Sequence, residues 1–262
     1  MSLLSKTLRN VATIVPFLLF ATPLANAEHT NDLECINPPG RANPADPFGC
    51  AASKITRDEI SHCNLETLGQ LANQGLHTLS YEGARERMFQ FVDVFVSEDN
   101  VRSVKSVYSP DLYAVGDAGI PQNGVNCEHS WPQSFLKLGE RFKESRTDLF
   151  HLFPVNGRVN SSRNNLPFAD CAAHSQEQGV RCHDGFEPPE RHKGRVARAM
   201  FYIAATYKLE MGNSQEVLLR QWNTTHPVTT DEVERSMRVH AVQGNWNPFI
   251  SHPEWVELVS DF

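Results

Sequence analysis

Residues 123–168 read NGVNCEHSWPQSFLKLGERFKESRTDLFHLFPVNGRVNSSRNNLPF and combine ligand-capable polar side chains with aromatic residues and prolines. They include an adjacent acid and histidine, Glu128 and His129, a second histidine, His151, and a tail rich in arginine and asparagine. Neutral histidine is the side chain best suited to act as a base near pH 7. Carboxylate and amide oxygens, such as those of Glu128 and Asn160, are ligands for a hard cation such as Mg²⁺. The stretch therefore predicts a metal-assisted hydrolytic site, of the kind that phosphodiester hydrolysis requires.

The adjacency of Glu128 and His129 sets a condition on this site. Neighbouring side chains in a strand point to opposite faces. Both residues can serve one site only where the strand ends or bends, and Pro132 just downstream is compatible with such an end. Residues 158–165 (RVNSSRNN) are then expected to present Asn160 from a helix or loop packed across a hairpin. His151 lies among apolar residues, so we expect it to support the site and not to bind the metal.

Spacing alone leaves other interpretations of these residues open. A Glu-His pair is common on protein surfaces, and an isolated asparagine often caps a helix or forms a turn. Asn160-Ser-Ser also matches a glycosylation acceptor, and a glycan there would be incompatible with metal binding. A zinc site is a further alternative, although its spacing matches no C-x₂-C pattern. That site would be built from Cys127, His129, Cys171, Cys182 and His183.

The first 27 residues have the features of a secretory signal peptide. Lys6 and Arg9 form a basic start, an apolar run interrupted by prolines follows, and Ala25-Asn26-Ala27 matches a cleavage site. A membrane anchor is the alternative, but the run is too short and too broken to span a bilayer, and later segments lack the ~18 uninterrupted apolar residues of a span. We therefore expect a periplasmic or extracellular protein with no membrane attachment after cleavage.

The charge of the chain restricts how it can bind nucleic acid. Removal of the peptide changes the formal net charge from −7 to −9, because two basic residues leave and no acidic ones do. A chain this acidic is not expected to coat nucleic acid through bulk charge. Because salt screens charges within about 10 Å, a local basic cleft remains compatible with an acidic total.

All six cysteines follow the expected cleavage site, and an even number in an exported protein favours three disulfides. The pairs that we expect are Cys171–Cys182 and Cys35–Cys50, which leave Cys63 to pair with Cys127. Residues 28–54 are rich in proline, glycine, asparagine and aspartate. They should form an irregular segment pinned by one of these bonds.

Hydrophobic spacing predicts two helices and a strand before the central stretch. The capping box that begins at Thr56 opens the first helix, and residues 81–96 should form the second. A β-branched run at residues 101–108 predicts the strand. In the second helix the side chains expected to face the core are Ala84, Met88, Phe91, Val92 and Phe95.

Beyond the central stretch we expect a loop at residues 170–189 and further helices. Residues 191–208 give the clearest helical pattern, with a basic group near its start. Thr229 should cap another helix, and Pro253 should begin a short one. The fold class predicted is α+β, mostly helical, with a single disulfide-stabilised domain over residues 55–262.

Four motifs run in order from the middle of the chain to its end: CEHSWPQSF (127–135), DLFHLFPVNGRVNSSRNNLPF (148–168), GRVARAMFYIAATY (194–207) and QGNWNPFISHPEWV (243–256). Together they resemble the endonuclease I family of bacterial periplasmic and secreted nucleases, members of the ββα-metal superfamily. With the helix and strand expected between residues 81 and 108, the resemblance covers most of the chain beyond residue 75. It implies a central ββα-metal motif, in which two strands and a helix hold the site.

The resemblance implies a role for each motif residue. The family's acid–histidine pair falls on Glu128, a metal ligand, and on His129, the general base that activates water. Its second metal ligand falls on Asn160. The cofactor implied is one Mg²⁺, for which Ca²⁺ or Mn²⁺ can substitute. The substrate implied is DNA, with RNA as a second candidate, bound by a monomer through phosphates and with little sequence preference.

The chain departs from the family at two positions that matter for charge. Some members carry a transition-state arginine in an insertion between the first two motifs, but this connection is short here, which leaves Arg141 and Arg146 as candidates. The C-terminal motif usually reads NRNPF, and Trp246 replaces its arginine. The remaining site predictions are phosphate contacts by Arg163, Arg158 and Lys137 and a supporting role for Asn164. The alternatives are a structural role for Arg163 and ordinary solvated charges for Arg158 and Lys137. The alternative function is a secreted nucleic-acid- or matrix-binding module that keeps the fold without catalysis.

Overall fold

The structure, a computed structural model, describes residues 65–116, 120–121, 124–172 and 176–262. Within these ranges the helices are α2 (Leu65–Asn73), α3 (Tyr81–Arg87), the π-helix η1 (Met88–Val92), α4 (Gln133–Leu136), α5 (Phe142–Ser145), α6 (Gly157–Arg163), α7 (Glu190–Tyr207), α8 (Asn213–Thr225), α9 (Thr230–Gln243), α10 (Pro248–Ser251) and the 3₁₀ helix η2 (Pro253–Leu258). The strands are β1 (Val94–Val96), β2 (Arg102–Lys105), β3 (Leu112–Ala114), β4 (Val125–His129), β5 (Leu152–Asn156), β6 (Val180–Arg181) and β7 (Phe186–Glu187). The expected signal peptide, the segment 28–54, the capping box at Thr56 and Cys35, Cys50 and Cys63 lie outside the described residues.

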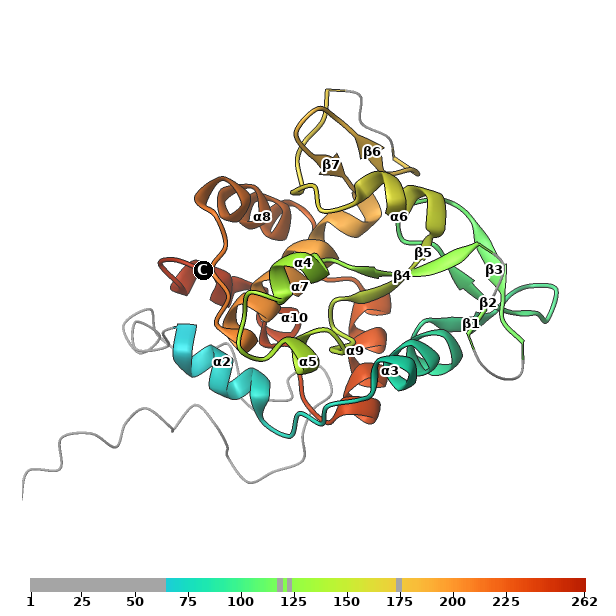
Figure 1. The fold of residues 1–262 in the computed structure, drawn as a ribbon, viewed down its shortest axis with the longest axis horizontal. Helices are drawn as coiled ribbons and strands as arrows, with labels where there is room; N and C mark the ends of the chain where they lie inside the picture. Colours follow the sequence, from blue (N-terminus) through green and yellow to red (C-terminus); the bar gives the residue numbers. More distant parts are fainter. Residues whose placement is uncertain (1–64, 117–119, 122–123, 173–175) are drawn as a thin grey trace, which may run out of the picture. The chain divides into compact units, whose positions relative to one another are not determined.

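The central stretch folds as two antiparallel strands followed directly by a helix (Figure 1). β4 and β5 pair along their whole lengths, with Glu128 opposite Phe153 and His129 opposite Leu152. The last residue of β5, Asn156, is also the N-cap of α6, and its side-chain oxygen accepts hydrogen bonds from the first backbone N–H groups of that helix. This cap turns the chain from strand to helix without a loop, as a ββα motif requires.

α7 forms the centre of the helical part, and almost all of its side chains are buried. α2 and α8 both pack against it. The approach of α2 is close because its contact residue is Gly69, where a Cβ would lie 2.3 Å from the carbonyl oxygen of Ala205. Helices packed around small antiparallel sheets confirm the predicted α+β class.

The helix expected over residues 81–96 ends earlier than predicted. α3 continues into the π-helix η1, and residues 94–96 then form the edge strand β1 of a three-stranded sheet ordered β1-β2-β3. The wider π-turn shifts the buried face, so Phe89 is fully buried while Phe91 and Phe95 are 42% and 40% exposed. The expectation that Phe91 and Phe95 belong to the core was wrong.

The C-terminal third contains the expected helices and some that were not expected. The side-chain oxygen of Thr229 accepts from the N–H of Glu232 and caps α9, as predicted. α8 was not anticipated, the loop at 170–189 contains the hairpin β6–β7, and the helix that begins at Pro253 is 3₁₀. Trp246 stacks on His240 with ring centroids 4.0 Å apart, so an aromatic contact stands where the family arginine would be.

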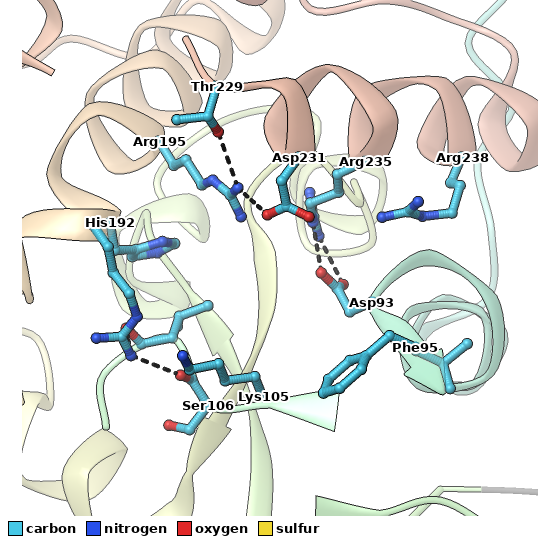
Figure 2. Close-up of a pocket in the computed structure, with 13 residues that line it drawn as sticks. Asp93, Phe95, Lys105, Ser106, His192, Arg195, Thr229, Asp231, Arg235 and Arg238 are labelled. Atoms are coloured by element: carbon cyan, nitrogen blue, oxygen red, sulfur yellow. Dashed lines mark hydrogen bonds and ion pairs between the residues drawn. The ribbon is translucent and has the colours of Figure 1, made fainter. Parts of the chain in front are cut away.

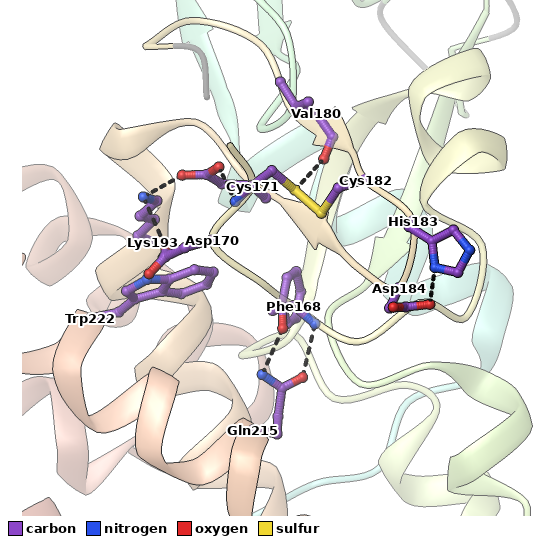
Figure 3. The surroundings of a disulfide bond; sticks show 11 residues. Phe168, Asp170, Cys171, Val180, Cys182, His183, Asp184, Lys193, Gln215 and Trp222 are labelled. Carbon is purple, nitrogen blue, oxygen red and sulfur yellow. Dashed lines mark hydrogen bonds and ion pairs between the residues drawn. A yellow bond between two sulfur atoms is a disulfide. The ribbon is translucent and has the colours of Figure 1, made fainter. Parts of the chain in front are cut away.

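One expected disulfide is present and another is contradicted. Cys171 and Cys182 are bonded and close the loop that carries β6 (Figure 3). Cys127 is a buried free thiol whose sulfur faces the sulfur of Met88 at 3.9 Å, so it does not pair with Cys63. The thiol lies on the core side of β4. The zinc alternative also fails, because the disulfide uses Cys171 and Cys182, and the described part of the chain holds no group of three or more His, Cys, Asp or Glu side chains able to bind a metal.

Candidate active site

His129 is the last residue of β4, and its imidazole is held by a backbone carbonyl. Its Nε2 lies 3.0 Å from the carbonyl oxygen of Arg146, which can only accept a hydrogen bond. Nε2 therefore carries the proton, and the lone pair of the neutral ring is on Nδ1. The side-chain amide nitrogen of Gln133 lies 3.4 Å from Nδ1, on the side of this lone pair. Nδ1 is thus the basic atom of His129.

The surroundings of His129 keep it neutral. Burial is the main cause that lowers the pKa of His129 well below its usual range, and the nearby rings and guanidinium groups of His151, Arg146 and Arg163 lower this pKa further. The hydrogen bond to the Arg146 carbonyl acts in the opposite direction. The ring of Tyr81 stacks alongside at 6.0 Å between centroids. A neutral imidazole in this position can accept a proton.

His151 lies edge-on to His129, with ring centroids 5.4 Å apart. Its Nε2 donates to the carbonyl oxygen of Ser145 at 2.7 Å, and the ring is fully buried. Burial lowers the pKa of His151 to about 4. The side chain thus packs behind His129 and carries no charge at neutral pH, as its supporting role requires.

Glu128 is 1% exposed and lies on the opposite face of β4 from His129. Its Oε1 accepts from the hydroxyl of Tyr108 at 2.8 Å and is 3.2 Å from a guanidinium nitrogen of Arg163. Burial raises the pKa of Glu128, whereas Arg163 and Tyr108 act to lower it. Both contacts go to Oε1 of this buried carboxylate.

Arg163, at the end of α6, is a buried ion-pair partner in this structure. Its guanidinium donates to the carbonyl oxygens of His129 and Ser130 at 3.1 and 2.7 Å as well as facing Glu128. These contacts tie α6 to the end of β4. This geometry favours the structural alternative for Arg163, in which it holds Glu128 and the end of β4 in place.

Asn160 projects from α6 toward the backbone of β4. Its Nδ2 donates to the carbonyl oxygen of Cys127, the residue before Glu128, at 3.4 Å. Within the described residues Oδ1 of Asn160 has no hydrogen bond, so the amide presents an acceptor beside the strand that carries Glu128. One carboxylate and one amide oxygen form a donor set that fits a hard, oxygen-loving cation such as Mg²⁺.

The two candidate transition-state arginines lie in different environments. Arg146 follows α5, its guanidinium lies 3.7 Å above the ring of Tyr81, and its Nε donates to Gln133 at 2.8 Å. Both contacts place it beside His129. Arg141 instead pairs with Glu144 and donates to Asn73, which connects α5 to α2.

The other predicted contacts flank the site. Arg158 and Lys137 are exposed, the first near the start of α6 and the second at the end of α4. Asn164 is the exposed C-cap of α6 and has a positive φ of 51°, a conformation that asparagine tolerates better than most residues. Their roles toward substrate stay predictions.

Sequence reasoning missed three residues that shape the site: Tyr108, Gln133 and Tyr81. Gln133 lies inside the motif CEHSWPQSF, so its position four residues after His129 was an available signal. Tyr108 and Tyr81 are distant in sequence and reach the site through tertiary packing. Local sequence patterns do not predict such contacts.

The chain is similar to several extracellular and periplasmic nucleases. An extracellular ribonuclease of Bacillus amyloliquefaciens is 32% identical over 181 residues, which cover 61% of this chain and 62% of the relative. An extracellular deoxyribonuclease of Aeromonas hydrophila is 27% identical over 215 residues, which cover 70% of this chain and 94% of the relative. A periplasmic deoxyribonuclease of the same organism is 32% identical over 117 residues, which cover 42% of this chain and 49% of the relative. The chain spans 62% and 53% of the lengths of this ribonuclease and the extracellular ribonuclease of Bacillus subtilis (strain 168). The model of the Endonuclease I family matches residues 66–254, well over half of the sequence, and the chain belongs to that family.

Proposed function

We propose that the chain is an exported, metal-dependent endonuclease that hydrolyses phosphodiester bonds of DNA, with RNA as a second candidate substrate and little sequence preference. The observation that carries the proposal is the orientation of His129, whose Nε2 is fixed by a carbonyl so that the basic lone pair lies on Nδ1, where the Gln133 amide contacts it at 3.4 Å. Relatives named as deoxyribonucleases and as ribonucleases support both substrate classes.

His129 acts in this proposal as the general base through Nδ1. It takes a proton from the attacking water while Nε2–H keeps its bond to the carbonyl of Arg146, and that carbonyl stabilises the positive ring that results. Burial keeps the ring neutral beforehand. A negatively charged phosphodiester beside it favours the protonated form, so substrate binding increases the proton affinity when the base is needed.

Glu128 and Asn160 would hold Mg²⁺, or Ca²⁺ or Mn²⁺ in its place, through their side-chain oxygens. When bound, the ion neutralises charge that develops on the phosphate and on the leaving oxygen. Two protein ligands leave the remaining positions to water and substrate, which is the usual arrangement for Mg²⁺. Tyr108 and Arg163 orient the carboxylate of Glu128 for this task.

Arg146 is the preferred candidate for the cation that stabilises the transition state, because it lies beside His129, and Arg141 is the second candidate. Lys137 and Arg158 would contact flanking phosphates, while Arg163 acts by positioning Glu128 and Asn164 by ending α6.

Export to the periplasm or the medium follows from the predicted signal peptide and from the relatives named extracellular or periplasmic. Among the described residues no helix is long and apolar enough to cross a membrane. We propose a monomer. The alternative is a secreted binding module of the same fold without catalysis, and the intact set of Glu128, His129 and Asn160 favours the enzyme.

Digestion of supercoiled plasmid by the purified mature protein tests the proposal. We expect Mg²⁺ to support nicking, EDTA to abolish it, and His129→Ala to lose at least ~100-fold in rate, the usual scale of a general base. His183→Ala is the matched control, because its ring is 95% exposed. Cleavage undiminished by EDTA, or equal rates for the two histidine variants, would refute the mechanism.

A further inference from the structure

A cavity of about 500 Å³ lies apart from the residues of the proposed hydrolytic site (Figure 2). Its walls come from the three-stranded sheet on one side and from the N-terminal parts of α7 and α9 on the other. Its volume falls within the range of ligand-binding pockets. Glu128, His129 and Asn160 are not among the residues that line it.

The lining of this cavity is strongly basic in a chain whose net charge is −7. Two carboxylates, Asp93 and Asp231, face five cations, which gives a local charge of +3. His192 adds none, because burial lowers its pKa well below the usual range. The five cations are Lys105, Arg191, Arg195, Arg235 and Arg238.

Part of this positive charge is not neutralised inside the protein. Arg235 is paired with Asp93, Arg195 with Asp231, and Arg191 with Glu177 at 3.6 Å. Lys105 is exposed and forms no ion pair with any residue that the structure describes. Arg238 forms a long ion pair with Glu234, at 4.0 Å, and its Nε donates to the carbonyl oxygen of Val92. Figure 2 shows Lys105 reaching toward the cavity from the sheet and Arg238 from the helix opposite.

An exposed aromatic ring stands at the same place. Phe95 lines the cavity and is 40% exposed. It pairs with Ser103, two residues from Lys105, so Phe95 and Lys105 lie on one face of the sheet. A stacking ring beside cations is the combination by which proteins bind single-stranded nucleic acid.

We propose that this cavity is a second nucleotide-binding site, in which Phe95 stacks on an unpaired base while Lys105 and Arg238 contact the neighbouring phosphates. The inference rests on the proposed function in one respect, namely that the ligand is a strand of the substrate. The ring of His192 in the cavity wall lies 5.6 Å from the ring of Tyr108, and the hydroxyl of Tyr108 bonds to Glu128. A strand held here is therefore held on the far side of Tyr108 from the predicted metal ligand.

Fluorescence anisotropy in EDTA tests the base contact without cleavage. The probes are a labelled single-stranded oligodeoxythymidylate and an abasic oligomer of the same length. We expect Phe95→Ala to weaken binding of the thymidylate by roughly tenfold, the scale of one stacked base, and to leave the abasic oligomer unaffected. Phe91→Ala is the matched control, since Phe91 is equally exposed, at 42%, but does not line the cavity.

The phosphate contact has its own variant and control. Lys105→Gln should weaken binding of both oligomers and reduce the slope of log affinity against log salt by about 0.7. Lys208→Gln removes the same charge at the C-terminal end of α7, where Lys208 is 78% exposed, and should change neither.

The outcomes separate this site from the hydrolytic one. If Phe95→Ala matches Phe91→Ala and Lys105→Gln matches Lys208→Gln, the cavity is not a nucleotide site, even where Mg²⁺-dependent nicking is intact. The same conclusion holds if the wild-type protein binds neither oligomer. Cavity-dependent binding by a protein that fails to nick plasmid would support the site and overturn the proposed hydrolysis instead.

Discussion

Tyr108→Phe isolates the contribution of one hydrogen bond to the predicted metal ligand. The hydroxyl donates to Oε1 of Glu128 at 2.8 Å in a fully buried environment. Phenylalanine keeps the ring and its packing on Phe186 and His192, so no large cavity forms. A hydrogen bond to an ionised group contributes about 1.5–3 kcal/mol, and the free energy of unfolding should fall by this amount.

The same loss should change the proton affinity of Glu128. Because the Tyr108 hydrogen bond lowers the pKa of Glu128, its removal should raise that pKa. Protons compete with the cation for the carboxylate, so the acid limb of the nicking rate should move to higher pH. Urea unfolding in EDTA measures the free energy of unfolding. Plasmid nicking at several pH values measures the pH at which the rate falls on the acid side.

Tyr113→Phe provides the comparison for this experiment. It deletes the same atom from a partly exposed hydroxyl that accepts from the side-chain amide of Asn156 at 2.8 Å and also bonds to the carboxylate of Asp111. Because solvent screens this site, about 1 kcal/mol or less is expected. Equal stability losses for the two variants, with an unchanged acid limb for Tyr108→Phe, would show that the hydroxyl does not support an ionised Glu128.

Three further predictions follow from named contacts. In the folded protein the pKa of His151 is lowered from 6.5 to about 4. The stability that comes from burying its neutral ring is therefore fully present above pH 6.5 and is lost, by roughly 3 kcal/mol, as the pH falls toward 4. Urea unfolding should show that the free energy of unfolding of His151→Gln falls less steeply with acid than that of His183→Gln. Replacing both cysteines of the disulfide by serine should cost about 3 kcal/mol, given a separation of 11 residues, and unchanged urea midpoints would contradict this. Arg146→Gln should lower the nicking rate at saturating DNA far more than Arg141→Gln, whose loss should be mainly in stability, and the reverse order would exchange their roles.

The position of the central residues followed from the sequence because local rules govern them. Side-chain alternation predicted that the strand ends or bends there if Glu128 and His129 serve one site, and β4 ends at His129. An Asn-Gly step after β5 supplied the cap that opens α6 and presents Asn160. Capping and strand period act over a few residues, so a single sequence contains them.

The partners of those residues did not follow from the sequence, since tertiary packing selects them. Tyr108 precedes Glu128 by 20 residues and lies outside any motif, yet its hydroxyl is bonded to that carboxylate. For Arg163 the sequence left a phosphate contact and a structural role as equal alternatives. In the structure its 2% exposed side chain joins Glu128 to the end of β4. Sequence indicates which side chains carry charge, but it does not indicate which of these charges the fold encloses.

Two phenylalanines of the second predicted helix were wrongly assigned to the core, and one of them lines a candidate binding site. A period of 3.6 residues assigned Phe91 and Phe95 to the core, but the π-turn η1 and the strand β1 leave both exposed. Each forgoes part of the ~1.5–3 kcal/mol that burial of such a side chain contributes. Phe91 does not line the basic cavity, whereas Phe95 does. Positions where the local sequence pattern and the fold disagree are expected to be concentrated at binding sites. Comparing variants of Phe95 and Phe91 therefore distinguishes a ring that is exposed to bind a ligand from one that is exposed only because the π-turn shifts the helical register.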